Sequence, residues 1–140
     1  MELTHKINTF MATIWNRGEF SELAQFVHPQ YQVLDDPGDP WNGKTLDLDQ
    51  FKSRVLYSRN AFPDLNFEIH ETIEGSDKVA IRWTMSGTHR GDLPMLAATN
   101  KPFKISGMTF YYFKDGKVCG HRQAFDQLGF LSQVQAFPGH

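Results

Sequence analysis

The sequence predicts an α+β fold in which a curved antiparallel sheet forms a cone closed by three N-terminal helices. In the first half of the chain apolar residues recur at helical spacing, whereas from Leu65 onward they alternate with polar residues. Helices followed by a run of long strands are typical of α+β proteins, whose helices cover one face of the sheet. A length of 140 residues suits a single domain, residues 1–140, with its own core.

Three segments carry the helical spacing, and we predict helices over residues 3–16, 22–27 and 48–62. After the first, Gly18 can adopt the positive φ that commonly closes a helix. Ser21 is the expected N-cap of the second helix, and His28-Pro29 is expected to end it. Pro63 ends the third helix.

Two hairpins make up the second half of the chain, with strands predicted over residues 65–73, 79–85, 103–113 and 117–125. The last two strands meet at Asp115-Gly116, a strong signal for a type I′ turn. Earlier in the chain, residues 31–35 read as extended and residues 36–44 as a loop rich in Gly and Pro. Residues 128–134 are expected to form a short helix or coil.

The chain is rich in aromatic residues, with 12 Phe, 4 Tyr and 3 Trp. A strongly bent sheet closed by helices leaves a conical cavity whose walls are the inward-facing rings of the strands. The rings expected nearest the cavity are Trp15, Phe62, Trp83, Phe110 and Tyr112, and we treat these as candidate substrate contacts, although each is more often simple core. A buried Tyr112 would also need a hydrogen-bond partner.

Composition excludes several classes of protein. A formal net charge of -2 provides no field that would gather phosphates, so no nucleic-acid binding is expected. No stretch approaches the roughly 20 apolar residues of a membrane span. The N-terminal residues show no signal region, and the single cysteine, Cys119, fits a reducing compartment. We therefore expect a cytoplasmic chain without membrane contact.

Named cofactor motifs do not occur in the sequence, which has no phosphate-cradling Gly-Lys-Ser/Thr loop, no dinucleotide glycine fingerprint and no His-Glu-x-x-His helix. The six histidines are too scattered to show ligand spacing. We expect neither a metal nor an organic cofactor.

The last strand carries the most suggestive polar groups. Alternation places Arg122, Ala124 and Asp126 on one face and His121 and Gln123 on the other, and one of these faces must line the cavity. Desolvation in a ring-lined cavity disfavours the charged form of a carboxylate and so suits it to proton transfer. Asp126 is therefore the candidate general acid/base, with His121 and Arg122 as candidate substrate contacts. Alternatively, Asp126 caps the terminal helix.

A second polar cluster, residues 87–92, lies where a strand runs into a loop, a frequent position for ligand contacts. His89 in this cluster could donate a hydrogen bond to a substrate oxygen. The alternative is a histidine with a purely structural role at a strand end.

Five motifs in order resemble the SnoaL-like polyketide cyclase family, within the nuclear-transport-factor-2-like and ketosteroid-isomerase-like superfamily. These motifs are Trp15-Asn16-Arg17-Gly18, Val27-His28-Pro29-Gln30-Tyr31, Ala61-Phe62-Pro63-Asp64-Leu65, Gly87-Thr88-His89-Arg90-Gly91, and Asp115-Gly116-Lys117 followed by Asp126. The resemblance implies an intramolecular aldol ring closure without metal or organic cofactor. It also implies an acid/base aspartate, matched by Asp126, and a homodimer paired through the open face of the sheet.

Three positions depart from the pattern of the cyclases resembled. Ala98-Thr99-Asn100 replaces a Pro-Thr-Gly turn, Tyr112 stands where those cyclases have a histidine, and Trp15 replaces a helix-one tyrosine. The expected function is acid/base chemistry on a small aromatic or polyketide-like carbonyl compound. The same cone could instead house an isomerase or hydratase, or a non-catalytic small-molecule-binding module, because one fold hosts many functions.

Overall fold

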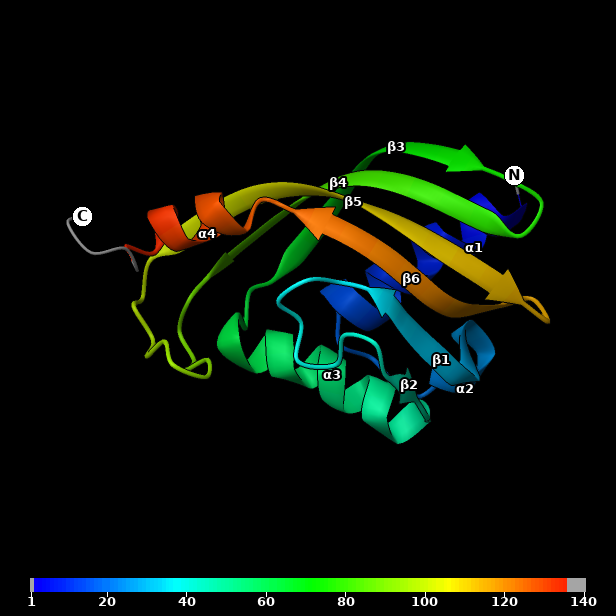
Figure 1. Ribbon diagram of the computed structural model, residues 1–140, viewed down its shortest axis with the longest axis horizontal. Coiled ribbons are helices and arrows are strands. Elements are labelled where there is room, and N and C mark those ends of the chain that lie inside the picture. The colour runs from blue at the N-terminus through cyan, green and yellow to red at the C-terminus, as the bar shows by residue number, and fades with distance from the viewer. Residues whose placement is uncertain (1, 136–140) are drawn as a thin grey trace.

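The computed structural model describes residues 2–135. Its elements in chain order are α1 (Glu2–Phe10), the π-helix η1 (Met11–Asn16), α2 (Leu23–Phe26), β1 (Val27–Asp35), β2 (Thr45–Leu46), α3 (Leu48–Ala61), β3 (Asn66–Glu74), β4 (Lys78–Thr88), β5 (Pro102–Lys114), β6 (Lys117–Phe125) and α4 (Gln127–Gln133). Figure 1 shows the long strands arching over α3 and the helical N-terminal segment, with α4 at one end of the sheet.

The six strands form one sheet in the order β2-β1-β6-β5-β4-β3. The β3–β4 and β5–β6 hairpins were expected, and they pair antiparallel with each other through β4 and β5. The exception to the predicted antiparallel sheet is β1, which runs parallel to β6. The parallel pair is possible because a long connection, which includes α3, β3, β4 and β5, separates β1 from β6 in the chain. The predicted α+β class is confirmed.

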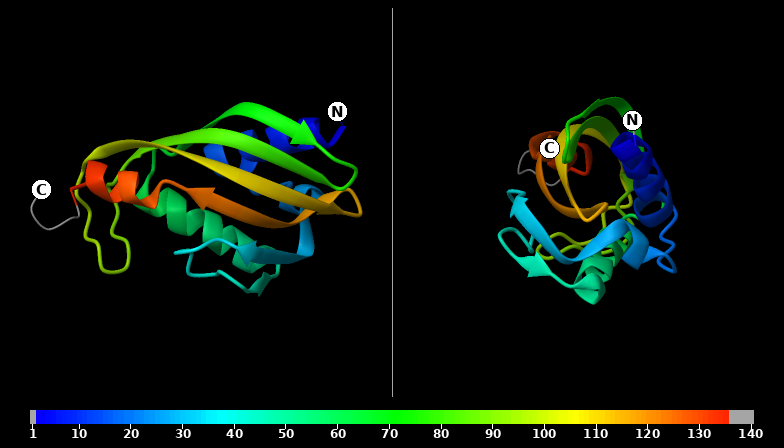
Figure 2. Two further views of the ribbon diagram at one scale, coloured as in Figure 1. Left: turned by 45° about the horizontal axis from the view of Figure 1, so that its top comes forward. Right: turned by 90° about the vertical axis from the view of Figure 1, so that its right-hand side faces the viewer.

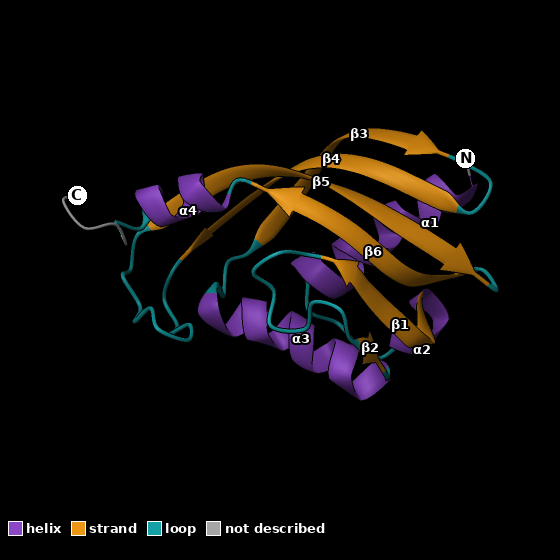
Figure 3. Ribbon diagram, viewed as in Figure 1, coloured by secondary structure: helices purple, strands orange, loops and turns teal. Residues whose placement is uncertain are grey.

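The sheet is bent, and its strands curve over the helices, as the end-on view in Figure 2 and the colouring by secondary structure in Figure 3 show. Register shifts interrupt the β3–β4 pair and the β5–β6 pair, and such irregularities increase bending and twist. Gly107 lies at a tight contact on β5, because a Cβ at this position would come within 2.4 Å of Trp83 Cζ2. The absence of a side chain at Gly107 lets the Trp83 indole pack directly on the strand.

The first predicted helix is confirmed, but its second half is a π-helix (Met11–Asn16). A π-helix leaves carbonyl groups near its end to be satisfied, and Arg59 Nη1 donates to the carbonyl oxygens of Trp15 and Asn16 at 2.7 and 2.9 Å. Asn16 also exchanges two hydrogen bonds with the backbone of Phe67, at 2.7 and 3.0 Å. These contacts fix the end of the helix against α3 and β3.

The second helix is a single turn, and the predicted cap by Ser21 is wrong. Glu22 occupies the N-cap position and makes no side-chain cap hydrogen bond. The strand β1 begins at Val27, so Pro29 lies within it rather than ending the helix. Proline is tolerated there because the β1–β6 register is interrupted between Val27 and Gln32.

The third helix has clear start and stop signals and carries an unusual buried residue. Asp47 and Gln50 form a capping box, with hydrogen bonds of 2.8 and 2.9 Å. Its buried face contains Phe51 and Val55 together with the charged Arg54. A buried arginine on the core side of a helix requires anionic partners, and these define the site described below. No helix in residues 2–135 is long and apolar enough to cross a membrane.

Candidate functional site

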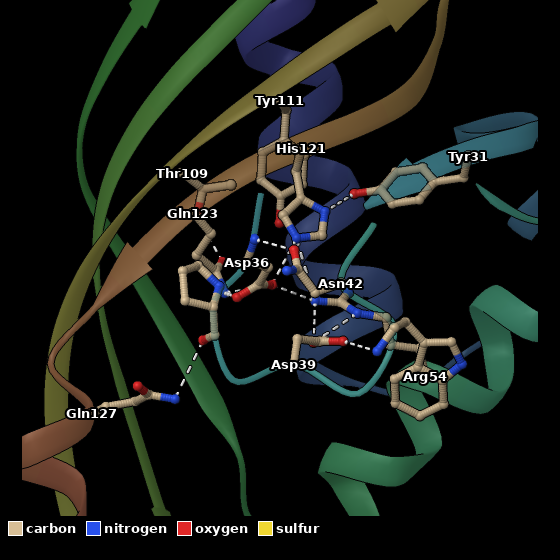
Figure 4. Close-up of polar contacts among 12 residues, drawn as sticks. Tyr31, Asp36, Asp39, Asn42, Arg54, Thr109, Tyr111, His121, Gln123 and Gln127 are labelled. Atoms are coloured by element: carbon tan, nitrogen blue, oxygen red, sulfur yellow. Dashed lines mark hydrogen bonds and ion pairs between the residues drawn. The ribbon is translucent and has the colours of Figure 1, made fainter. Parts of the chain in front are cut away.

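A cavity of about 560 Å³ lies between the inner face of the sheet, α3, α4 and two loops. One side of the cavity is apolar, with rings and aliphatic side chains that include Phe62, Met85, Ile105 and Phe130. The other side is polar and is lined by Asp36, Asp39, Arg54, Gln123 and Gln127. Figure 4 shows the side chains of this polar cluster, which come from the loop after β1, α3, β6 and α4, together with neighbouring side chains of β1, β5 and β6.

Asp36 is the buried carboxylate of the cluster, with 1% of its surface exposed. It follows directly after β1, in the loop that was predicted over residues 36–44. The loop folds back on itself: the Asp36 N–H donates to Asn42 Oδ1 at 2.8 Å, and the Asp39 N–H donates to the Asp36 carbonyl at 3.0 Å. Gly38 and Gly43 have φ values of 87° and 81°, which glycine adopts readily.

Arg54 joins two carboxylates with one nitrogen. Its Nη2 lies 3.0 Å from Asp36 Oδ2 and 2.9 Å from Asp39 Oδ2, and its Nε donates to Asp39 Oδ2 at 3.1 Å. The guanidinium also lies over the Trp15 ring, 5.4 Å from its centroid. Desolvation lowers the pKa of Arg54, but attraction from neighbouring groups, led by Asp39, outweighs it and the pKa is raised. The three charged groups carry a net charge of -1.

His121 connects Asp36 to Tyr31 behind the cavity wall. His121 Nε2 lies 2.8 Å from Asp36 Oδ2, and its Nδ1 lies 2.5 Å from the Tyr31 hydroxyl oxygen. Burial lowers the pKa of His121, and burial holds the pKa of Tyr31 well above its usual value. The imidazole is therefore neutral and the phenol protonated. His121 contacts the carboxylate rather than the cavity.

A chain of hydrogen bonds orients the amide of Gln123 toward Asp36. Trp83 Nε1 donates to Thr109 Oγ1 at 2.9 Å, and Thr109 Oγ1 donates to Gln123 Oε1 at 2.8 Å. With its oxygen engaged, Gln123 presents Nε2 to the carboxylate oxygens of Asp36 at 3.3 and 3.4 Å. The inner face of the sheet thus supplies Asp36 with a third donor.

Five aromatic residues were predicted to line the cavity, and three of them do. Trp15, Phe62 and Trp83 lie in its wall; that they bind substrate stays a prediction. The prediction is wrong for Phe110 and Tyr112, which lie on the outer face of the sheet. Phe110 is 48% exposed, and Tyr112 lies beneath Lys78 Nζ, 5.5 Å from its ring centroid. Alternation along β5 turns Thr109 and Tyr111 inward instead.

The last strand presents to the cavity the face that carries His121 and Gln123, not the face that carries Arg122 and Asp126. His121 and Gln123 point inward, whereas Arg122 is exposed on the outer face and does not line the cavity, so that it contacts substrate stays a prediction. Asp126 is also exposed and lies outside the cavity lining. Its Oδ1 accepts a hydrogen bond from the Gly129 N–H at 2.8 Å, which makes it the N-cap of α4. The structure therefore corresponds to the capping alternative; a catalytic role for Asp126 stays untested.

His89 makes structural contacts, and its hydrogen bond to a substrate oxygen stays a prediction. It is fully buried, and its Nδ1 lies 3.1 Å from Thr99 Oγ1. Its backbone N–H donates to Lys101 O at 3.0 Å, and its carbonyl accepts from the Asn100 N–H at 2.8 Å. These bonds anchor the loop whose residues 93–96 line the cavity mouth. His89 itself does not line the cavity.

Sequence reasoning missed Asp36, Asp39 and Arg54, which the fold brings together. The charged residue Arg54 between the apolar positions Phe51 and Val55 of α3 was the available signal. Within residues 2–135, no group of three or more His, Cys, Asp or Glu side chains is placed to hold a metal ion.

The fold and the cavity define a class: cone-shaped α+β proteins with an internal cavity of small-molecule size. The chain belongs to the SnoaL-like polyketide cyclase family, because the sequence profile of that family matches residues 5–134. The recognition made from the sequence motifs is confirmed.

Relatives of established name and known structure agree with this membership. The chain is 26% identical to the aklanonic acid methyl ester cyclase AcmA of Streptomyces galilaeus over 131 residues, which cover 89% of this chain and 85% of that protein. A homologous cyclase, DnrD of Streptomyces peucetius, is also 26% identical over 125 residues, with the same two coverages of 89% and 85%. A candidate polyketide cyclase from Acidithiobacillus ferrooxidans is 36% identical, with a TM-score of 0.89 and coverage of 97% of this chain and 96% of that chain.

Proposed function

We propose that this chain is a cofactor-independent, polyketide cyclase-like enzyme. It would close a ring by intramolecular aldol-type condensation, or carry out a related proton transfer, on an aromatic or polyketide carbonyl compound. The observation that carries this proposal is a buried carboxylate, Asp36, at the polar side of an otherwise largely apolar cavity. We assign the general acid/base role to Asp36.

The two oxygens of Asp36 differ in what they contact, and this supports the assignment. Oδ2 accepts from His121 Nε2 and Arg54 Nη2 at 2.8 and 3.0 Å, whereas the contact of Oδ1 among the described side chains is a longer one, 3.4 Å to Gln123 Nε2. Oδ1 therefore keeps a lone pair for a substrate proton. Because Asp39 contacts the same nitrogen of Arg54, the guanidinium stays ion-paired after Asp36 is protonated.

In the proposed reaction, Asp36 Oδ1 removes a proton from the carbon next to a substrate carbonyl, which breaks the C–H bond and forms an enolate. The enolate carbon attacks a second carbonyl carbon of the same molecule, forms the C–C bond and leaves an alkoxide. The proton on Asp36 then passes to the alkoxide, so the product carries a hydroxyl group and Asp36 is ionised again. A rigid aromatic wall favours this attack by holding the substrate in one folded conformation.

The charges of the cavity favour a substrate without a carboxylate. Among the described lining residues Arg54 is the only cation, and it is already paired with Asp36 and Asp39. A substrate carboxylate would find no free cation and would meet a net negative charge. Two relatives are named for acting on a methyl ester, which is neutral. We expect a neutral ester or ketone to bind more tightly than the corresponding acid.

The test replaces each of three aspartates, one at a time, by asparagine. With aklanonic acid methyl ester as the probe, we expect Asp36→Asn to lower turnover by roughly 10²–10⁴-fold, the usual contribution of a general acid/base. Asp126→Asn tests the residue that the family resemblance designates, and Asp35→Asn is the matched control because Asp35 is the exposed neighbour of Asp36. Turnover is measured by formation of the cyclised product, and α-proton exchange in D₂O is followed by NMR.

Two results would contradict the assignment of Asp36 as the general acid/base. Full activity of Asp36→Asn together with an inactive Asp126→Asn would return the acid/base role to Asp126. A wild-type protein that binds the probe in the cavity but causes neither exchange nor cyclisation would support the binding-module alternative instead.

We also propose that the chain forms a homodimer through the outer face of its sheet. Met108 and Phe110 are 60% and 48% exposed there, and Met108 pairs across the strands with Ala124, which is also exposed. Leu34 on the neighbouring part of β1 is partly exposed as well. Large apolar side chains exposed on one face of a sheet favour association with a second copy.

A further inference from the structure

We propose that Tyr31 is a positioning residue for the acid/base carboxylate. Through its hydrogen bond to His121, it holds the imidazole in the neutral form with the proton on Nε2, directed at Asp36. This inference rests on the proposed function of Asp36, but it concerns a residue that lies outside the cavity.

The geometry carries the inference. The Tyr31 hydroxyl, the two nitrogens of His121 and Asp36 Oδ2 form a continuous series of contacts of 2.5 and 2.8 Å, and all three residues are at most 1% exposed. The Tyr31 ring is itself held by Phe51 of α3, with centroids 4.7 Å apart in an edge-to-face arrangement. The ring of Tyr31 packs against helix α3, while its hydroxyl reaches His121 of the neighbouring strand β6, as Figure 4 shows for the hydroxyl.

The position of the protons follows from the partners. The carboxylate oxygen of Asp36 can only accept, so His121 Nε2 must donate. In a neutral ring Nδ1 then has no hydrogen, and the Tyr31 hydroxyl must donate to it. If Tyr31 accepted instead, Nδ1 would carry the hydrogen, and a neutral ring would place a bare Nε2 lone pair against the carboxylate.

Charged and titratable groups face His121 from several elements. Tyr31 comes from β1, Asp36 from the loop after β1, and Tyr111 from β5, with its ring centroid 6.0 Å from that of His121. Arg54 of α3 places Nη2 3.4 Å from His121 Nε2, which opposes a second positive charge on the ring. The hydroxyl of Tyr31 also disfavours protonation of the His121 ring, because its donation to Nδ1 stabilises the neutral imidazole.

Loss of the hydroxyl has a defined consequence for the reaction. Without it, Nδ1 is free to take up a proton, so the pKa of His121 rises. An imidazolium next to Asp36 would hold the carboxylate as an ion pair and weaken it as a base. The acid limb of the kcat/KM profile would therefore move to higher pH.

The test is Tyr31→Phe, which keeps the ring packed on Phe51 and removes only the hydroxyl. We expect kcat for aklanonic acid methyl ester to fall roughly tenfold, KM to change little, and the acid limb to move to higher pH. Tyr112→Phe is the matched control, because it removes a phenol from the outer face of the sheet. A Tyr31→Phe variant with an unchanged acid limb and kcat within twofold of the wild type would overturn the proposal.

Two further measurements keep the test independent of folding and of the proposed reaction. NMR titration of His121 in the ligand-free protein, assigned with His121→Asn, should show protonation at higher pH in Tyr31→Phe. This result holds or fails even if Asp36→Asn proves fully active, which would sink only the proposed function. In the His121→Asn background, Tyr31→Phe should have no additional effect on kcat. An undiminished effect there would show that Tyr31 does not act through His121.

Discussion

Three donors converge on the carboxylate of Asp36, and they explain how a charge can lie inside this core. His121 and Gln123 approach from β6, and Arg54 approaches from α3. A buried carboxylate without such partners would be costly, because desolvation penalises the charged form. The same donors fix the direction of the carboxylate, so the site is preorganised before any substrate enters.

Stability at acid pH should depend on His121. Burial lowers its pKa in the folded protein, whereas the unfolded value is about 6.5. Between these two values the unfolded chain binds more protons, so the free energy of unfolding falls as pH drops below about 6.5, by at most about 1.4 kcal/mol per pH unit for this group. The stabilising contribution is fully present above that pH.

Urea unfolding of the wild type and of His121→Asn between pH 4 and pH 8 measures this effect, and His70→Asn, at an exposed position, controls for the change of residue type. A wild-type curve that runs parallel to that of His121→Asn over the whole range would disprove the linkage.

For single residues, the sequence predicted which side chains of a strand share a face better than it predicted what each side chain does. Alternation along β6 correctly separated His121 and Gln123 from Arg122 and Asp126, but it does not say which face is the inner one. Asp36 lies in an irregular loop, where no periodicity reports on burial. Its partner Arg54 is 18 residues away in the chain, so only the folded structure brings the two charges together.

Elements that depend on local signals were predicted well. The helical stripe of residues 3–16, the third helix with its end before Pro63 and the Asp115-Gly116 turn all appear, and these two turn residues have φ values of 54° and 75°. The predicted cap by Ser21 failed because tertiary packing, rather than a cap, holds the single turn of α2. The π-helical half of the first helix was not predictable from spacing alone, since its capping partner Arg59 comes from another helix.

The capping box gives a prediction for α3, the helix that supplies Arg54. Asp47→Ala removes the acceptor for the Gln50 N–H and should lower the free energy of unfolding by about 0.5–2 kcal/mol. Ser21→Ala is the control, because Ser21 is exposed and α2 has no side-chain cap. Chemical denaturation of both variants provides the comparison. Equal losses for the two substitutions would mean that the capping box does not stabilise the helix.

The arrangement of the whole sheet depends on contacts that are distant in sequence. The parallel pairing of β1 with β6 joins residues about 90 positions apart, such as Val33 and His121, and no local pattern reports it. This pairing brings the end of β1, and hence Asp36, next to the inward-facing residues of β6. The inner face of the sheet therefore becomes a wall of the cavity, and the outer face is left with Met108 and Phe110 exposed.

The outer face provides the last prediction, on the proposed homodimer. Charged substitutions at its centre, Met108→Glu with Phe110→Glu, should convert a dimer of the wild-type chain into a monomer, because burying two unpaired carboxylates from each copy would oppose association. Light scattering at micromolar concentration measures the mass directly.

Ile73→Glu is the matched control for the outer-face substitutions, because Ile73 is a 73% exposed apolar residue on the edge strand β3. A monomeric wild type, or a dimer that survives both outer-face substitutions, would show that this face does not pair. Since the cavity opens on the opposite side of the sheet, the monomeric variant should keep its turnover.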